Sequence, residues 1–248
     1  MKQPRSFLIP LLVIFILSCA IVAYVAYMPS LKPLINQYYC TYIINDTTMA
    51  AIKHELQEIA IDDAKPNGEA RYPGYGFTFA IRNQKSVIDK SNNRDASIIY
   101  AIDGKELIVI SNPDDSFAFS MKATAKEQNE DQFIRAYVDH ELITEYEYWK
   151  AAATASIKDI TLFDNQRNMG LSCLLRYKTC LAPNIAESIY EFQNQSIKGF
   201  LTCGTNGSKP SSIVMLFSQE SPDRCYPVTL INFEQEEVLR FLSSIEFE

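Results

Sequence analysis

The longest apolar run in the chain lies close to its N-terminus. The 22 residues from Phe7 to Met28 include no charged side chain. A helix of that length would span roughly 33 Å, which is enough to cross the hydrocarbon core of a bilayer. Lys2 and Arg5 precede the run and Lys32 follows it. This distribution favours an N-terminus in the cytoplasm, with the remainder of the chain on the outer side of the membrane.

Three interpretations of residues 1–28 differ in the fate of this segment. An uncleaved signal anchor is preferred, because the run is longer than the apolar core of a typical signal peptide. Cleavage near residues 18–20 is the second interpretation. Lipidation of Cys19 is the third, because Ile16-Leu17-Ser18-Cys19 resembles the lipobox of bacterial lipoproteins. The chain stays apolar after Cys19, however, whereas lipoproteins usually become polar there.

Residues 29–66 are predicted to form a juxtamembrane connector followed by a helix. Asn45 or Asp46 is the expected N-cap, and the helix would end near Asp62. Apolar residues recur there at steps of three and four, which is the spacing of a helix with one buried face. They are Met49, Ile52, Leu56 and Ile59.

Three tyrosines follow the apolar run at a short distance. Tyr38, Tyr39 and Tyr42 would lie just outside the bilayer, beyond the predicted anchor. Aromatic side chains favour the interface between hydrocarbon and water. We therefore expect these tyrosines to contact the membrane interface, with a contact to a protein partner as the alternative.

Residues 67–248 are predicted to form one extracytoplasmic α+β domain. An aromatic and apolar run over residues 75–81 is typical of a strand, and the polar stretch 83–95 is expected to be a surface loop. Two further apolar runs flank Asp103-Gly104, and a two-residue Asp-Gly loop between such runs predicts a β-hairpin.

The second half of the domain is predicted to contain helices and then a β-meander. Asn129, with Gln132 three residues later, resembles a capping box and would begin the longest helix, which extends to Ala153. A second helix is expected over residues 170–181. The predicted meander strands and the closing helix are residues 188–192, 197–203, 212–218, 226–233 and 234–244. The fold expected from this order is an antiparallel sheet flanked by helices.

Three short motifs resemble a known type of exported domain. They are Ile189-Tyr190-Glu191-Phe192, Ile197-Lys198-Gly199-Phe200 and the closing Ser243-Ser244-Ile245. Together with the order of elements they resemble PsbP-like α/β/α sandwich domains of small bacterial envelope proteins. The resemblance covers roughly residues 75–247, and a helical insertion of about 60 residues departs from the family's compact pattern. It implies a fold and an envelope location, but no reaction.

Composition and charge narrow the classes of partner. Hydrophobic residues make up 47% of the chain and charged residues 21%, which is ordinary for a globular protein. The net charge is −7, and the first 28 residues contain basic residues but no acid, so the remainder is more acidic still. Phosphate backbones repel such a surface, and nucleic acid is therefore not an expected partner.

The cysteines predict a disulfide in an exported chain, because exported proteins meet oxidising conditions. Cys173 and Cys180 are seven residues apart, about 10.5 Å in a continuous helix, which is too far for a bridge. Cys203 and Cys225 would lie at opposite ends of the meander. Cys180 precedes the first meander strand, whose start would lie at the same end of the sheet as Cys203, so Cys180 with Cys203 is the preferred pair. Cys225 could then pair with Cys40 or Cys173. Buried free thiols are the alternative.

The ionisable residues give no complete catalytic or metal-binding pattern. His140-Glu141 begins a zinc-protease motif, but Thr144 occupies the position of the second histidine. Glu141 and Glu145 would share a helix face, yet two carboxylates supply too few oxygens for calcium. A solvated acidic face is therefore expected, with no metal, no cofactor and no catalytic residue assigned. Phosphate-binding glycine loops and nucleophile motifs are also missing from the sequence.

These observations predict a non-enzymatic, single-pass protein of the bacterial inner membrane. Its anchor would be residues 7–28, and its outer domain would bind an envelope protein or support assembly of a complex. The alternatives are a subunit of a secretion apparatus, and an envelope hydrolase or ligand-binding protein. A pocket that collects Asp139, His140 and Glu141 would favour the hydrolase or ligand-binding protein. A flat, exposed apolar patch would favour the interaction module.

Overall fold

The computed structural model describes most of the predicted domain and a short segment of the N-terminal run. The described residues are 15–22, 54–63, 69–81, 85–91, 97–104, 106–114, 120–161, 164–181, 186–206 and 208–248. The predicted connector up to residue 53, with Tyr38, Tyr39, Tyr42 and Cys40, lies outside them.

Residues 15–22 form a helix whose side chains are exposed, with Phe15 at 65% and Ile21 at 60% of full exposure. No helix within the described part of the chain combines the length and the apolar character that a membrane crossing requires. The signal anchor over residues 1–28 therefore stays a prediction.

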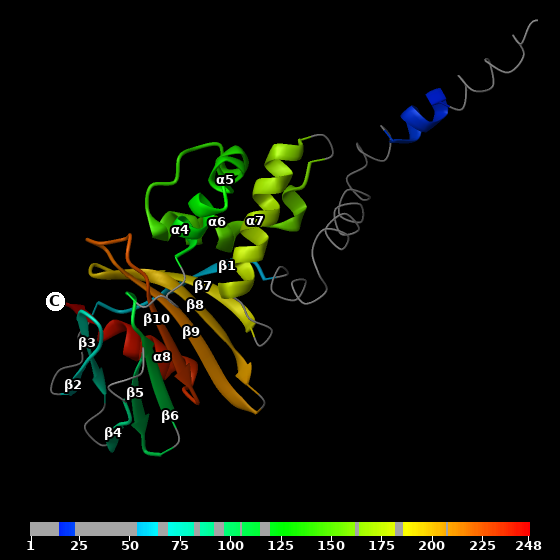
Figure 1. The fold of residues 1–248 in the computed structure, drawn as a ribbon. Helices are drawn as coiled ribbons and strands as arrows, with labels where there is room; N and C mark the ends of the chain where they lie inside the picture. Colours follow the sequence, from blue (N-terminus) through cyan, green and yellow to red (C-terminus); the bar gives the residue numbers. More distant parts are fainter. Residues whose placement is uncertain are drawn as a thin grey trace, which may run out of the picture.

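An eight-stranded sheet forms the centre of the domain (Figure 1). Its strands, in spatial order, are β1 (Leu56–Ala60), β7 (Ala186–Gln193), β8 (Ile197–Asn206), β9 (Lys209–Ser218), β10 (Tyr226–Ile231), β6 (Glu106–Ser111), β5 (Ser97–Ile102) and β4 (Val87–Asp89). β1 runs parallel to β7, and the other neighbouring strands of this sheet, within the described residues, pair antiparallel. The α+β class is therefore confirmed, but the sheet is mixed rather than purely antiparallel.

The predicted meander and hairpin are both confirmed. β7, β8, β9 and β10 follow one another along the chain and across the sheet. β5 and β6 pair on either side of Asp103-Gly104, whose φ angles are 50° and 69°. The register pairs Ile102 with Glu106, however, so three positions rather than the expected two separate the paired strands. Asp and Gly both tolerate positive φ, which suits them to this turn.

The helix predicted to end near Asp62 is wrong over residues 54–62, the part of it that the structure describes, because none of them is helical and Leu56–Ala60 form strand β1. Leu56 packs against the core on one face of the sheet and Ile59 against the core on the other. Residues an odd number apart point to opposite faces of a strand. The three-residue spacing of these apolar side chains therefore fits a strand buried on both sides as well as a helix.

A layer of helices covers one face of the sheet (Figure 1). It contains α4 (Met121–Glu127), α5 (Asp131–Val138), α6 (Glu145–Thr154), the short 3-10 helix η1 (Ile157–Asp159) and α7 (Asn165–Leu181). Tyr146 and Trp149 of α6 lie in the core beneath this layer, 8% and 0% exposed. The predicted helix over residues 170–181 is confirmed and begins five residues earlier.

The single long helix predicted from Asn129 to Ala153 is wrong, because the chain breaks it between α5 and α6. Asp139 has φ 61° and ends α5, and a capping box of Thr144 and Glu147 begins α6. Asn129 is not a cap either, since its own φ is 56° and Glu130 is the N-cap of α5. A left-handed residue cannot continue an α-helix, so the helical spacing alone overestimated its length.

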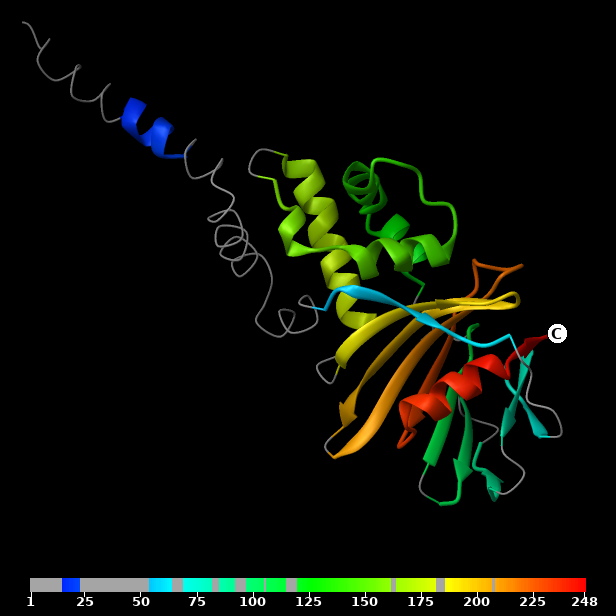
Figure 2. The ribbon, with the colours of Figure 1, turned by 180° about the vertical axis from the view of Figure 1, so that it is seen from behind.

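The opposite face of the sheet carries α8 (Gln235–Ser243) and a small sheet (Figure 2). The small sheet has the order β11 (Glu246–Phe247), β3 (Phe77–Ile81) and β2 (Ala70–Pro73). Ser244 joins these elements, because its hydroxyl donates to the carbonyl of Phe241 and accepts from the N–H of Ala80 at 3.0 Å. Both faces of the large sheet therefore carry a second layer.

Four tyrosines of the helical layer donate hydrogen bonds to carboxylates. Each hydrogen-bonded pair joins two segments of the layer, or joins the layer to the sheet. Burial of the hydroxyl and its bond to the carboxylate both raise the pKa of each tyrosine. The pairs are Tyr137 with Asp159, Tyr146 with Glu191, Tyr148 with Asp131 and Tyr177 with Glu130. These bonds satisfy polar groups that the packing of the helices removes from water.

Helices α5 and α7 approach each other most closely at Gly170. A Cβ atom on Gly170 would lie 1.9 Å from the carbonyl oxygen of Phe133 and 3.0 Å from the Cβ of Tyr137. Backbone atoms cannot yield as a flexible side chain does, so any larger residue must push the two helices apart.

We expect Gly170→Ala to lower the free energy of unfolding by about 1–3 kcal/mol, because overpacking outweighs the gain in helix propensity. Urea denaturation measures this effect. Gln166→Ala, at an exposed position of the same helix, is the matched control and should change stability little. A Gly170→Ala protein as stable as the control would contradict the close packing of α5 and α7.

Lys178 is a buried base in the middle of this layer. Lys178 is only 2% exposed. Its Nζ donates a hydrogen bond of 2.9 Å to the backbone carbonyl of Ala155, which is the C-cap of α6. Burial lowers the pKa of Lys178 to about 8, and the charges of Glu55 and Asp159 offset part of that effect.

We expect Lys178→Met to change how the free energy of unfolding depends on pH. Between the folded pKa of about 8 and the unfolded pKa of about 10.4, the unfolded chain holds a proton that the folded chain has lost. Stability contributed by Lys178 therefore increases with pH, by about 2 kcal/mol from pH 7 to pH 9.5. The difference in unfolding free energy between the native chain and the variant should shift by that amount in favour of the native chain. Lys150→Met, at a more exposed lysine, should show no such shift, and a pH-independent difference for Lys178→Met would refute the assignment.

Candidate functional site

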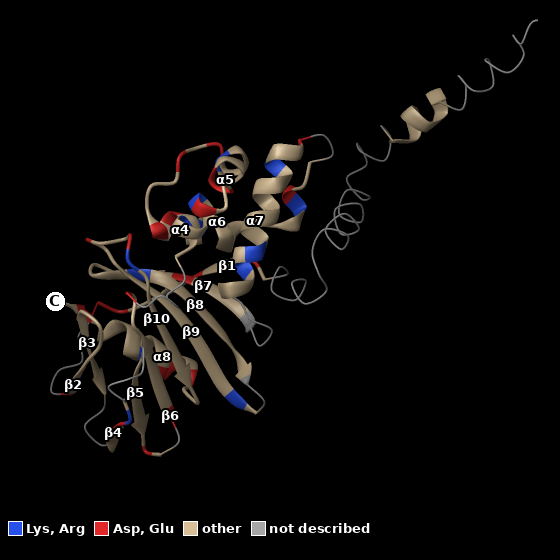
Figure 3. Cartoon of the chain, in the orientation of Figure 1, with Lys and Arg blue, Asp and Glu red and all other residues tan. Residues whose placement is uncertain are grey.

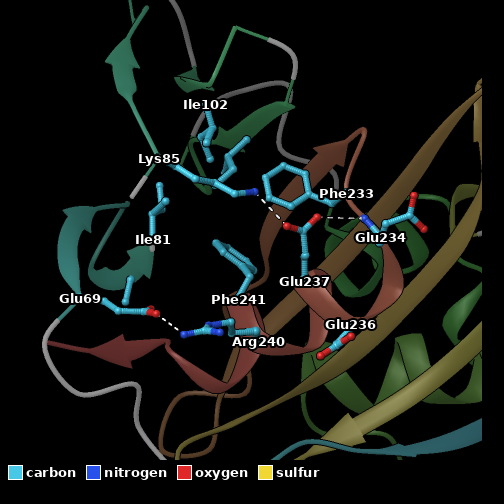
Figure 4. A pocket seen from close by; sticks show the side chains of 12 residues that line it. Glu69, Ile81, Lys85, Ile102, Phe233, Glu234, Glu236, Glu237, Arg240 and Phe241 are labelled. Atoms are coloured by element: carbon cyan, nitrogen blue, oxygen red, sulfur yellow. Dashed lines mark hydrogen bonds and ion pairs between the residues drawn. The ribbon is translucent and has the colours of Figure 1, made fainter. Parts of the chain in front are cut away.

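A pocket of about 410 Å³ lies between α8, the small sheet and the β5–β6 hairpin (Figure 4). Pockets of this size are typical of sites for small molecules or for single side chains of a partner. Its lining comes from five separate parts of the chain: Glu69, Ala80, Ile81, Lys85, Ile102, Ile108, Phe233, Glu234, Glu236, Glu237, Arg240 and Phe241.

The floor of the pocket is apolar and rigid. Its side chains belong to the core between the large sheet and α8, and all are at most 8% exposed. They are Ile81, Ile102, Ile108, Phe233 and Phe241. Each projects from a strand or helix, or from the residue that links β10 to α8, so the floor is preformed. Such a surface favours the hydrocarbon part of a ligand.

Lys85 forms the charged centre of one side of the pocket. Its Nζ lies 2.7 Å from Glu106 Oε2 and 2.8 Å from Glu237 Oε1, and it also lies 5.9 Å from the centre of the Phe233 ring. Figure 4 shows the Lys85 side chain directed toward Phe233 and Glu237. Burial lowers the pKa of Lys85, but its hydrogen bonds to both carboxylates outweigh burial and raise the pKa above its usual value. The amine is therefore charged at neutral pH and is not a nucleophile there.

Arg240 and Glu69 form a second ion pair at the other side of the pocket (Figure 4). The Glu69 side chain is only 9% exposed, whereas that of Arg240 is 43% exposed. The pair joins α8 to the segment before β2. A buried carboxylate requires such a partner, because desolvation of an unpaired charge is expensive.

Charged side chains form much of the pocket lining. Among the described residues, four glutamates, one lysine and one arginine line it. The N-terminus of α8 is already capped, because Glu234 and Glu237 form a capping box there. The positive end of the helix dipole therefore faces carboxylates of the chain itself.

The predicted acidic cluster is dispersed by the break between α5 and α6. Asp139, His140 and Glu141 are exposed in the loop between the helices and do not line the pocket. The prediction that Glu141 and Glu145 share a helix face is wrong, because α6 begins only at Glu145. Glu145 is 2% exposed and accepts bonds from Ser120 and from the first backbone N–H groups of α4. It caps a helix and is not part of a solvated face. Within the described part of the chain, no three His, Cys, Asp or Glu side chains converge to hold a metal ion.

The preferred disulfide between Cys180 and Cys203 is not formed. No disulfide joins any two of the cysteines that the structure describes, which are Cys19, Cys173, Cys180, Cys203 and Cys225. Cys180 lies on α7, on the helical side of the sheet, whereas Cys203 packs against the core on the α8 side. The sheet separates the two thiols, because residue 203 of β8 points away from the helices.

The pocket residues had no distinguishing signal in the sequence. Lys85 falls in the stretch 83–95 that was predicted to be a loop, which the structure corrects by placing strand β4 within it. Lys85 and Glu237 are 152 residues apart. Charged residues of this kind are common on any surface, so only the folded chain shows that they meet.

Comparison with known proteins gives no match: no model of a known protein family fits the chain, and no curated protein matches it.

Lysine and arginine are interspersed with acidic residues over the helical layer rather than gathered on one element (Figure 3). Evidence on function therefore comes from the geometry of the pocket.

We expect Lys85→Met to lower the free energy of unfolding by about 1–3 kcal/mol, because Glu106 and Glu237 would lose the cation that neutralises them. Combining it with Glu106→Gln should restore part of this loss, since a neutral amide needs no counterion. Urea denaturation of the four proteins of this double-mutant cycle measures the coupling. Strictly additive effects would show that Lys85 and Glu106 do not interact.

Proposed function

We propose that this protein is a non-enzymatic binding module of the bacterial envelope. A single helix within residues 7–28 would anchor it in the inner membrane, with the α+β domain outside the cytoplasm. The charge-free run and the basic residues that precede it support this placement. The resemblance to PsbP-like domains belongs to the same proposal.

The pocket beside α8 is the observation that carries this proposal. It combines a rigid apolar floor with polar groups that converge from α8 and from the small sheet and hairpin. Such a combination is the usual form of a binding site. Its lysine and arginine are each held by carboxylates, so they orient a bound group electrostatically rather than attack it.

The pocket supports a specific binding function for this domain rather than a general role in assembling an envelope complex. A hydrolase is the weaker alternative, because the exposed His140 loop places no acid–base pair in the pocket. The bound molecule would be a small ligand, or a side chain that a partner protein inserts.

The test is site-specific photo-crosslinking in intact host cells. A photoreactive residue replaces Glu236, which lines the pocket and is exposed on α8. The matched control places it at Gln132, exposed on α5 in the helical layer. The full chain is then purified from membranes and its intact mass is measured, so that both small and protein adducts are detected.

We expect irradiation to give a discrete adduct at position 236 and none of the same mass at position 132. Equal adducts at both positions would show nonspecific contact. Absence of any adduct at position 236, in a chain recovered from the membrane fraction, would overturn the proposal.

A further inference from the structure

We propose that two copies of this chain associate through an apolar face of the large sheet that the helical layer leaves uncovered. This face lies on the opposite side of the sheet from the pocket beside α8, so the inference does not depend on the proposed binding site. The occupant of the face would be the same face of a second copy, packed sheet against sheet.

The helical layer reaches only part of its side of the large sheet. On β9, Met215 and Phe217 pack in the core under the helices, whereas Ile213, on the same side of the strand, belongs to neither core cluster. No residue within strands β10, β6, β5 and β4, as the structure describes them, belongs to the core under the helices. Figure 1 shows the same limit, because the helices lie over one end of the sheet and β5, β6 and β10 extend beyond them.

Burial alternates along these strands, as it does where only one face of a sheet is packed. On β6 and β10, buried residues that face α8 alternate with half-buried residues that face away from it. An antiparallel sheet with one face in water normally carries polar side chains on that face. The half-buried positions here include Leu107, Val109 and Ile231 instead.

The strand register gathers such side chains into two rows across the sheet. The first row contains Ile88, Ala101, Leu107 and Ile231, and the second contains Ile99, Val109, Thr229 and Ile213. We call these eight residues the open face. None of them is charged, none belongs to either core cluster, and Ile88 at the edge is 57% exposed. A contiguous apolar surface of this kind marks a contact with another macromolecule.

The open face and the row that borders it have the size of a small protein interface. Five strands about 4.8 Å apart and three rows about 6.8 Å apart span roughly 24 by 20 Å, which is about 500 Å². Two copies in contact would remove about 1,000 Å² from water, which is close to the lower limit for a specific interface. A reversible dimer is therefore expected rather than a permanent one.

The chemistry of the open face favours a second copy over an unlike, charged partner. Thr229 is the only one of the eight residues with a polar side chain. Charged groups of a partner would lose their water against this face and gain no counterion, which is costly. The partner must therefore be flat, apolar and uncharged over the same area, and the open face of a second copy meets all three conditions. Two sheets can pack in this way about 10 Å apart, and a contact between identical patches closes as a dimer.

The test is sedimentation equilibrium of the purified full chain in density-matched detergent, over a series of protein concentrations. We expect a reversible equilibrium between monomer and dimer with a micromolar dissociation constant. A native chain that remains monomeric at about 0.5 mM, where a micromolar dimer would be almost fully formed, would overturn the inference.

Charged substitutions then locate the contact on the open face. Val109→Lys and Thr229→Lys each place an ammonium group where a second copy would bury it, so each should raise the dissociation constant at least tenfold. Ile143→Lys is the matched control, because Ile143 is 65% exposed between α5 and α6 and lies outside the open face. It should dimerise as the native chain does, and circular dichroism verifies that each variant is folded.

Cysteine cross-linking gives a second measurement that needs no charged variant. In a contact between identical patches, side chains near the centre lie close to the same side chains of the copy. Val109→Cys should therefore form a disulfide-linked dimer under mild oxidation, well above the level of the native chain, whose own cysteines provide the background. Gln132→Cys, at an exposed position of α5, should not exceed that background.

A dimer that survives in folded Val109→Lys and Thr229→Lys would place the contact elsewhere and overturn the inference. The same conclusion follows if Val109→Cys cross-links no more than the native chain. None of these measurements involves the pocket, so their failure would leave the adduct expected at position 236, and with it the proposed binding function, unaffected.

Discussion

Strands β8 and β9 lie inside the eight-stranded sheet, and both of their faces must be removed from water. Phe200 and Phe217 point into the helical layer, whereas Leu201 and Leu216 point toward α8. One layer cannot cover two faces, so the chain needs helices on one side and α8 with the small sheet on the other. Most other features of the domain depend on this requirement, including the close contact of α5 with α7 and the position of the pocket.

The helical layer buries polar groups together with its apolar ones, and it satisfies them internally. Tyrosine hydroxyls meet carboxylates, Glu145 caps α4, and Lys178 donates to the end of α6. Each of these bonds joins segments that are separate in the chain, so they fix the arrangement of the helices as well as their stability. The buried ionisable residues of the layer, such as Glu145 and Lys178, are therefore engaged in structure.

The opposite layer is less completely packed, and this difference gives it the character of a site. α8 meets the strands through ion pairs at two places, Lys85 with Glu237 and Arg240 with Glu69. Both ion pairs lie at the edge of the pocket, and apolar side chains such as Ile102, Ile108 and Phe241 form its base.

The sequence by itself determined the elements whose signal is local. The Asp103-Gly104 hairpin, the four meander strands and α8 were predictable because alternation, turn residues and helical spacing all lie within a few residues of one another. Tertiary structure decided the rest. Leu56–Ala60 forms a strand because β7 offers an edge to pair with, and α5 ends at Asp139, which adopts the left-handed conformation. The pocket was not predictable, since Glu69, Lys85, Glu237 and Arg240 meet only after segments up to 171 residues apart come together, and no local pattern encodes such a meeting.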